Sequence, residues 1–302
     1  MLKFLEKIDN QIGATRESHA VNCGFVTTGT STVKGDFFKR TTFLSSRVDT
    51  VVNLLSAIRF DETTASSLQG FQDGLDIHVV APSNRVVIDA FLGLDLLDIQ
   101  EQKQEHQGVY LLHDLSRQLK KVSVKGASKL IMVMSQTNLA ITLKNGDATL
   151  GEVSCPGSSA NVPIVSLQEN EYSFHFKTLS EEFSRILNNM SRVFKIDIDC
   201  KAHRINFLSV GTTSVITLSL QLQPEDSRII MGDPTMSSYS ACFKKHDFLH
   251  ALRLCKFHEF VKLGFSSMSP MLILFEVNDW IDESGYEPSS VSIFISSSVA
   301  EE

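Results

Sequence analysis

The chain has 302 residues, of which 42% are hydrophobic and 21% are charged, and its formal net charge is −7. This composition predicts a folded protein with a sizeable core and leaves little room for a long disordered segment. The acidic balance argues against nucleic-acid binding over the whole surface, because phosphates are repelled by it, but a local basic stripe inside an acidic shell is not excluded.

The cysteines and the apolar runs indicate a soluble intracellular protein. Five cysteines are scattered without a CxxC pair, a pattern typical of reduced thiols. No apolar run reaches the roughly 20 residues that span a bilayer, and the charged N-terminus MLKFLEKIDN does not fit a secretory signal. We therefore expect no contact with a membrane.

The first half of the chain predicts two helices and several strands. Residues 1–35 fit no repeated pattern and are expected to form an extension. Apolar residues at helical spacing predict helices over 46–59 and 113–122. Runs of β-branched and aromatic residues predict strands over 75–82, 85–93, 129–134 and 138–144.

A segment rich in Pro, Gly and Ser, SCPGSSANVPIVSLQEN (154–170), has the composition of an exposed connector. It separates a first domain, residues 36–153, from a second, residues 171–302.

The second half predicts the same kinds of element in the same order. Helices are predicted over 179–193 and 245–259, the first with Phe183, Ile186 and Leu187 on its apolar face. Strands are predicted over 171–177, 194–199, 204–210, 214–220, 260–267, 271–277 and 290–296.

The spacing of the four predicted helices indicates an internal duplication. The first two start about 67 residues apart and the last two about 66 apart. A solenoid repeats every ~20–50 residues. The longer period predicts an α+β fold made of two similar domains.

Basic side chains lie opposite the apolar stripe on several predicted helices. A charged outer face is also what any surface helix shows. If all four helices faced one cavity, however, that cavity would be positive and would bind a polyanion through its phosphates. The candidate DNA-binding residues are Arg117, Lys120, Lys121, Arg185, Arg192, His246, His250 and Arg253.

Several segments, in their order and spacing, resemble the DNA sliding clamp of eukaryotes and archaea, the proliferating-cell-nuclear-antigen type. EYSFHFKTLSEEFSRILNNMSRV (171–193) resembles the start of the clamp's second domain, and VKLGFSSMSPMLILFEV (261–277) resembles its closing hairpin. In the first half the similar segments are GDFFKRTTFLSS (35–46), APSNRVVIDAFL (81–92) and GVYLLHDLSRQLKKVS (108–123).

The resemblance implies a non-enzymatic processivity factor without a cofactor. It implies a trimeric ring of six domains, with helices lining the hole and antiparallel sheets outside. Its partners would be double-stranded DNA, bound without sequence specificity, a clamp loader, and DNA polymerases and repair enzymes. The expected location is the nucleus in a eukaryotic host, and otherwise the cytoplasm.

The resemblance also assigns sites. Arg117, Lys120, Arg192 and Arg253 fall on phosphate-contacting positions, whereas Asp49 and Thr50 replace a basic pair. A pocket for partner peptides would be formed by Val86, Val165, Leu167, Pro270 and Phe294. By analogy, edge strands within 138–152 and 194–199 would join neighbouring chains.

Two other functions remain open at this point. The departures from the replicative clamp, including Ser296–Ser298 in place of Ala-Pro-Lys, also suit a subunit of the hetero-trimeric DNA-damage checkpoint clamp. The segment HDFLH (246–250) is one residue away from a zinc-hydrolase signature, with His258 as a third ligand. Asp247, in the place of glutamate, would reach a metal-bound water poorly.

Overall fold

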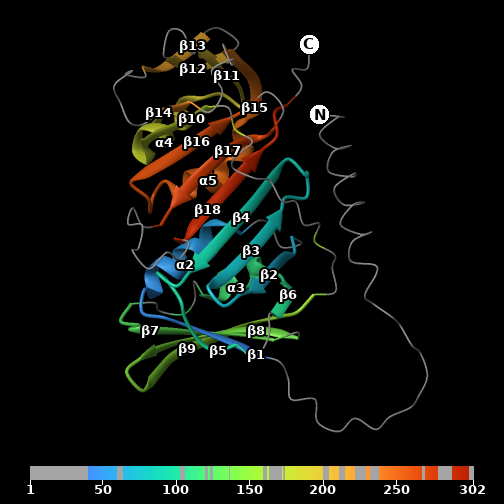
Figure 1. Ribbon diagram of the computed structural model, residues 1–302, viewed down its shortest axis with the longest axis vertical. Helices are drawn as coiled ribbons and strands as arrows, with labels where there is room; N and C mark the ends of the chain where they lie inside the picture. The colour runs from blue at the N-terminus through green and yellow to red at the C-terminus, as the bar shows by residue number, and fades with distance from the viewer. Residues whose placement is uncertain are drawn as a thin grey trace, which may run out of the picture.

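The computed structural model (Figure 1) describes most of the chain after residue 39. The predicted extension and most of the predicted connector lie outside the described residues. No helix in the described part is long and apolar enough to cross a membrane. The described residues are 40–59, 64–102, 106–119, 122, 125–135, 137–158, 162, 172, 174–199, 204–210, 215–221, 229–231, 238–266, 269–277 and 288–298.

The α-helices of the described part coincide with the four predicted helices, although α2, α4 and α5 are shorter than predicted. Apolar spacing positions them as expected, since α4 buries Phe183, Ile186 and Leu187. The last helix is preceded by a 3₁₀ helix, η2, over Lys245–Phe248. The α-helices are α2 (Val48–Ala57), α3 (Leu112–Leu119), α4 (Ser180–Asn189) and α5 (Leu249–Leu254).

The remaining regular structure is strand, and every ladder between described strands is antiparallel. The predicted α+β class is therefore confirmed. The first half contains β1 (Arg40–Ser45), β2 (Ser66–Gly70), β3 (Gly74–Val80), β4 (Val86–Gly93), β5 (Asp98–Gln102), β6 (His106–Tyr110), β7 (Lys129–Ser135), β8 (Asn138–Asn145) and β9 (Ala148–Pro156). The second half contains β10 (Phe174–Leu179), β11 (Val193–Asp199), β12 (Arg204–Val210), β13 (Val215–Gln221), β14 (Ile229–Met231), β15 (Ser238–Lys244), β16 (Phe260–Phe265), β17 (Met271–Glu276) and β18 (Ser290–Ile295).

The strands form three sheets that follow one another along the long axis of the molecule (Figure 1). A five-stranded sheet has the order β5-β1-β7-β8-β9, and a four-stranded sheet has the order β13-β12-β11-β15. Between them lies a nine-stranded sheet with the order β14-β10-β16-β17-β18-β4-β3-β2-β6. This central sheet contains strands from both halves of the chain.

Both halves of the chain repeat one topology. Each runs strand, helix, five strands, helix, three strands. The order β5-β1-β7-β8-β9 of the first half matches β14-β10-β16-β17-β18 of the second, and β6-β2-β3-β4 matches β15-β11-β12-β13. The duplication indicated by helix spacing therefore extends to strand order. β9 reaches Pro156, past the predicted start of the connector at residue 154.

The two halves meet in the central sheet, where β18 pairs with β4 from Ser290↔Phe91 to Ile295↔Val86. By position within its half, β18 corresponds to β9, and β4 corresponds to β13. β9 and β13 each end a sheet, because among the described strands they pair only with β8 and β12, respectively. The hypothesis that residues 194–199 form an edge is wrong: β11 lies between β12 and β15.

The helices cover one face of the central sheet and lie behind it in Figure 1. Because side chains alternate along a strand, Ile273 and Ile293 join the large core cluster with the helices. Leu272 and Phe294 belong to a separate cluster on the opposite face. We call these two sides the helix side and the sheet side.

Candidate nucleic-acid interface

On the helix side, α2 of the first half contacts α5 of the second. The Nδ1 of His250 lies 2.9 Å from the carbonyl oxygen of Ala57, and Nη1 of Arg253 donates to the carbonyl of Arg59 at 3.2 Å. The last carbonyls of a helix have no partner within that helix. Donors from α5 therefore satisfy the end of α2 and connect the halves a second time, beside the β4–β18 joint.

A groove of about 430 Å³ lies beside this contact, and most of the charged residues that line it are cationic. Asp247 is the one carboxylate among the lining residues that the structure describes, and that side chain is 7% exposed and bonded to Arg85 at 3.1 Å. Cations therefore outnumber carboxylates among the described lining residues. We call this feature the basic groove; its charged and titratable residues are Arg59, Arg85, His113, Lys244, His246, Asp247, His250 and Arg253.

Within the basic groove, Arg85 has a structural role. Its Nε donates to Asp247, and its Nη2 donates to the carbonyl of Ser296 at 3.3 Å. These bonds connect the start of β4 with η2 and with the residue after β18. Since both side chains of the pair are largely buried, we assign the excess positive charge of the groove to Arg59 and Lys244.

Four of the predicted DNA-binding residues are exposed to solvent: Arg117, Arg185, Arg192 and His246. Arg117 lies in the last turn of α3. Arg185 is on α4, where Glu182 is 3.9 Å away, and Arg192 lies between α4 and β11. Of the predicted set, only His246, His250 and Arg253 line the basic groove. Lys120 and Lys121 lie outside the described residues.

His250 does not present its ring to solvent, contrary to the prediction. It is 6% exposed, and its Nδ1 is taken by the Ala57 carbonyl. The prediction assumed one continuous α-helix from 245, but the segment begins as 3₁₀ helix, which has fewer residues per turn. As a result, the buried residues of this segment are Asp247, Phe248, His250, Ala251 and Leu254.

Sequence reasoning missed two cations of the basic groove as candidates. Arg59 ends the predicted helix 46–59 but follows the shorter α2, and Lys244 ends β15, outside every predicted helix. They come together only because the two halves pack against each other. Their signal in the sequence is weak, since Arg59 is the last residue of one predicted helix and Lys244 directly precedes another.

The zinc-site alternative gains no support from these side chains. His246 is exposed and His250 is buried against α2, while Asp247 is paired with Arg85. His258 bonds through Nδ1 to the carbonyl of Glu276 at 3.3 Å. Among the residues that the structure describes, no group of three His, Cys, Asp or Glu side chains could hold a metal ion.

The predicted peptide pocket is not assembled as expected. Val86 belongs to the core on the helix side, whereas Phe294 lies on the sheet side. In the sheet, Phe294 pairs with Val87 and not with Val86. The prediction therefore chose a residue one position away, whose side chain lies on the opposite face. Phe294 is 3% exposed and Pro270 is also buried. Val165 and Leu167 lie outside the described residues.

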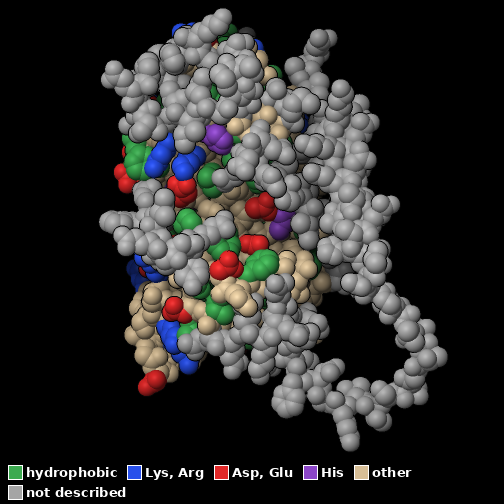
Figure 2. Space-filling model, viewed as in Figure 1, with side chains coloured by type: hydrophobic (Ala, Val, Ile, Leu, Met, Phe, Trp, Pro, Cys, Tyr) green, Lys and Arg blue, Asp and Glu red, His purple; other side chains and the backbone are tan. Residues whose placement is uncertain are grey.

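The sheet side has a different charge pattern. Among the described side chains in Figure 2, basic and acidic groups are intermixed. Several form pairs across neighbouring strands, such as Lys262 with Glu276 and His78 with Asp89. The described part of this side therefore lacks the local cationic excess of the basic groove.

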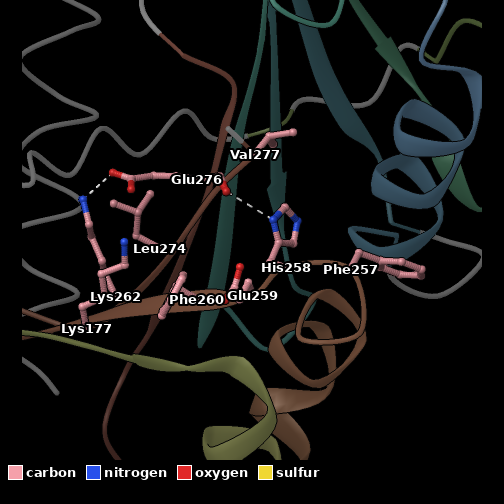
Figure 3. Close-up of a pocket in the computed structure, with 9 residues that line it drawn as sticks. All are labelled: Lys177, Phe257, His258, Glu259, Phe260, Lys262, Leu274, Glu276 and Val277. Carbon is pink, nitrogen blue, oxygen red and sulfur yellow. Dashed lines mark hydrogen bonds and ion pairs between the residues drawn. The ribbon is translucent and has the colours of Figure 1, made fainter. Parts of the chain in front are cut away.

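A small polar cleft of about 80 Å³ lies at the start of β16 and the end of β17 (Figure 3). Lys262 is paired there with Glu276, and the Nε2 of His258 is buried without a hydrogen-bond partner. Burial lowers the pKa of His258, partly offset by its bond to the Glu276 carbonyl. These internal contacts account for the polar side chains of the cleft, and the lowered pKa favours the neutral form of His258.

The sequence matches no model of a known protein family and no curated protein.

Proposed function

We propose that this chain is a subunit of a DNA sliding clamp, a ring that encircles duplex DNA and holds polymerases and repair enzymes on it. The observation that carries the proposal is the joint between the two halves. Strands β18 and β4, paired inside the chain, correspond by position to β9 and β13, the two sheet edges. Pairing β9 of one copy with β13 of the next would repeat the internal joint.

Such a contact uses different surfaces on the two partners. Contacts of this head-to-tail kind generate a closed ring when the rotation between copies closes. Exposed apolar side chains on both edges support it, because open edges with apolar residues promote association: Leu150 on β9 is 41% exposed, and Ile216 on β13 is also 41% exposed. By the resemblance, three copies would supply six similar units.

The charge of the helix side supports duplex DNA as the ligand. Arg59 and Lys244 concentrate positive charge in the basic groove of a chain whose formal net charge is −7. Phosphates would be attracted to this side and repelled elsewhere. Phosphate contacts position DNA without reading its bases, which suits a clamp that must move along any sequence.

The proposal is tested by blocking each edge separately. Leu150→Lys would place a charge on β9, and Ile216→Lys would place one on β13. Val193→Lys is the matched control, because Val193 is similarly exposed, at 48%, but lies on β11, away from both edges. We expect the wild type and the control to form a ring and both edge variants to lose it, as measured by light scattering after size-exclusion chromatography.

Mixing the two edge variants gives the sharper result. The Leu150→Lys chain keeps β13 and the Ile216→Lys chain keeps β9, so together they can form one joint and should give a dimer. A mixture that stays monomeric while the wild type assembles would show that assembly uses another surface. A monomeric wild type would favour the hetero-trimeric checkpoint clamp, in which β9 and β13 pair with different chains.

A further inference from the structure

A second groove on the helix side adjoins the basic groove and contains an exposed aromatic residue. Its volume is about 610 Å³, and it shares Arg59 and Arg253 with the basic groove. Phe257 is 51% exposed and is the one aromatic among the exposed large hydrophobic residues of the described part. We call this feature the Phe257 groove.

The Phe257 ring is held by ordered backbone at the end of α5. The Phe257 N–H donates to the Leu254 carbonyl at 2.9 Å, and that of Lys256 donates to the Arg253 carbonyl at 3.3 Å. Figure 3 shows the ring directed toward α2 and away from the Lys262–Glu276 pair. These hydrogen bonds fix the backbone that carries Phe257. The exposed ring therefore offers the groove a surface on which a flat group could stack.

The walls combine apolar surface with a cationic excess. Val52 of α2 and Val122, which follows α3, contribute apolar surface beside Phe257. Among the described lining residues, Arg59, Lys125, Arg253 and Lys256 are cationic and Asp49 is the one carboxylate. An aromatic platform inside a positive groove is the arrangement by which proteins bind single-stranded nucleic acid, with bases on the ring and phosphates on the cations.

We propose that Phe257 stacks with an unpaired base, so that the protein binds DNA containing a single-stranded segment more tightly than unbroken duplex. Phosphates of the same strand would lie on Lys256 and Arg253, and Arg253 continues into the basic groove. In duplex DNA the bases are stacked on one another and offer no face to the ring. This inference rests on the proposed function for its duplex-binding part only.

The test compares three labelled DNAs by fluorescence anisotropy: a thymidine oligonucleotide, a duplex with a recessed end, and an unbroken duplex. We expect Phe257→Ala to weaken binding of the first two about tenfold and to leave the unbroken duplex within twofold of wild type. Phe257→Trp, which keeps a stacking ring, should restore the lost affinity. Leu179→Ala is the matched control, because that apolar side chain is 41% exposed and lies outside both grooves.

If Phe257→Ala lost affinity equally for all three DNAs, or for none of them, the stacking role would be overturned. If the wild type binds the oligonucleotide but not the duplex, the clamp function fails and the stacking site stands. If Phe257→Ala instead weakens only a synthetic acidic peptide containing aromatic residues, the groove binds peptide and the inference is wrong. Unchanged thermal unfolding of Phe257→Ala would show that the effect is local.

Discussion

The two histidines of HDFLH show how local backbone geometry decides the role of a residue. His246 is exposed at the basic groove, whereas His250 is buried and bonded to the end of α2. A continuous α-helix would place residues i and i+4 on the same face. The 3₁₀ turn at the start of this segment separates their environments, so that one histidine faces solvent and the other joins the two halves.

Replacing each histidine in turn should separate these roles. We expect His250→Ala to lower the free energy of unfolding by about 1–3 kcal/mol, because it leaves the Ala57 carbonyl buried without a donor. His250→Asn should recover part of that loss, because its amide nitrogen takes the position of Nδ1. His246→Ala should leave the stability unchanged. Urea denaturation of the three variants checks this, and equal stability of both alanine variants would contradict it.

His258 predicts a dependence of stability on pH. Burial lowers its pKa below the ordinary 6.5, so between the lowered pKa and 6.5 the unfolded chain binds more protons than the folded one. Stability is then complete above about pH 6.5 and falls as the pH decreases through this window. His175, whose pKa is lowered by burial and by Lys262, adds in the same direction.

The measurement is thermal unfolding at pH 7.5 and pH 5.5. His258→Asn keeps a donor for the Glu276 carbonyl but cannot be protonated in this range. We expect this variant to lose less stability than the wild type on acidification. Parallel curves for the two proteins would show that the charge state of His258 does not contribute.

At the scale of elements, apolar periodicity predicted the helices well. All four were predicted in the correct place, because their core-facing residues recur at helical spacing and tertiary packing preserved that pattern. The strand β12, with its alternating apolar residues, and the strand β17, a continuous apolar run, were also predicted. No pattern in the sequence predicted β2, SSLQG, or β5, DIQEQ. These strands have few β-branched or aromatic residues and owe their form to their neighbours in the sheet.

The position of a strand within a sheet was harder to predict than the strand itself. Residues 194–199 alternate between apolar and charged residues, as an edge strand does, but they form the interior strand β11. Alternation reports which face is buried and not how many neighbours the strand has. The same limit explains the peptide pocket: the difference between Val86 and Val87 depends on register, which the sequence pattern alone did not fix.

For the whole molecule, the essential feature is the contrast between a negative net charge and a positive groove at the α2–α5 contact. The composition of the sequence showed the negative net charge, whereas the positive groove forms only where the two halves pack together. Arg59 and Lys244 are far apart in the sequence and belong to different halves, so their proximity could not be predicted from any one segment. The predicted helix faces located Arg253 and His246, whereas Arg59, at the end of the predicted helix 46–59, was not among the candidates and Lys244 lay outside every predicted helix.

The salt dependence of DNA binding tests this charge arrangement. Each cation that neutralises a phosphate adds about 0.9 to the slope of log K against log salt concentration for duplex DNA. We expect Arg59→Gln combined with Lys244→Gln to reduce that slope by about 2 and to weaken binding equally for different sequences. Lys129→Gln, on the exposed surface of β7, is the control. An unchanged slope in the double variant would remove the basic groove from the interface.

The joint between the halves has a mechanical consequence. Inside the chain, the β4–β18 ladder is reinforced by the Arg85–Asp247 pair and by the bonds from His250 and Arg253 to the end of α2. A seam between β9 and β13 of separate copies would have no covalent link across it. A protein that opens the proposed ring would therefore separate neighbouring protomers and leave each protomer intact. The number of possible opening sites would then equal the number of chains.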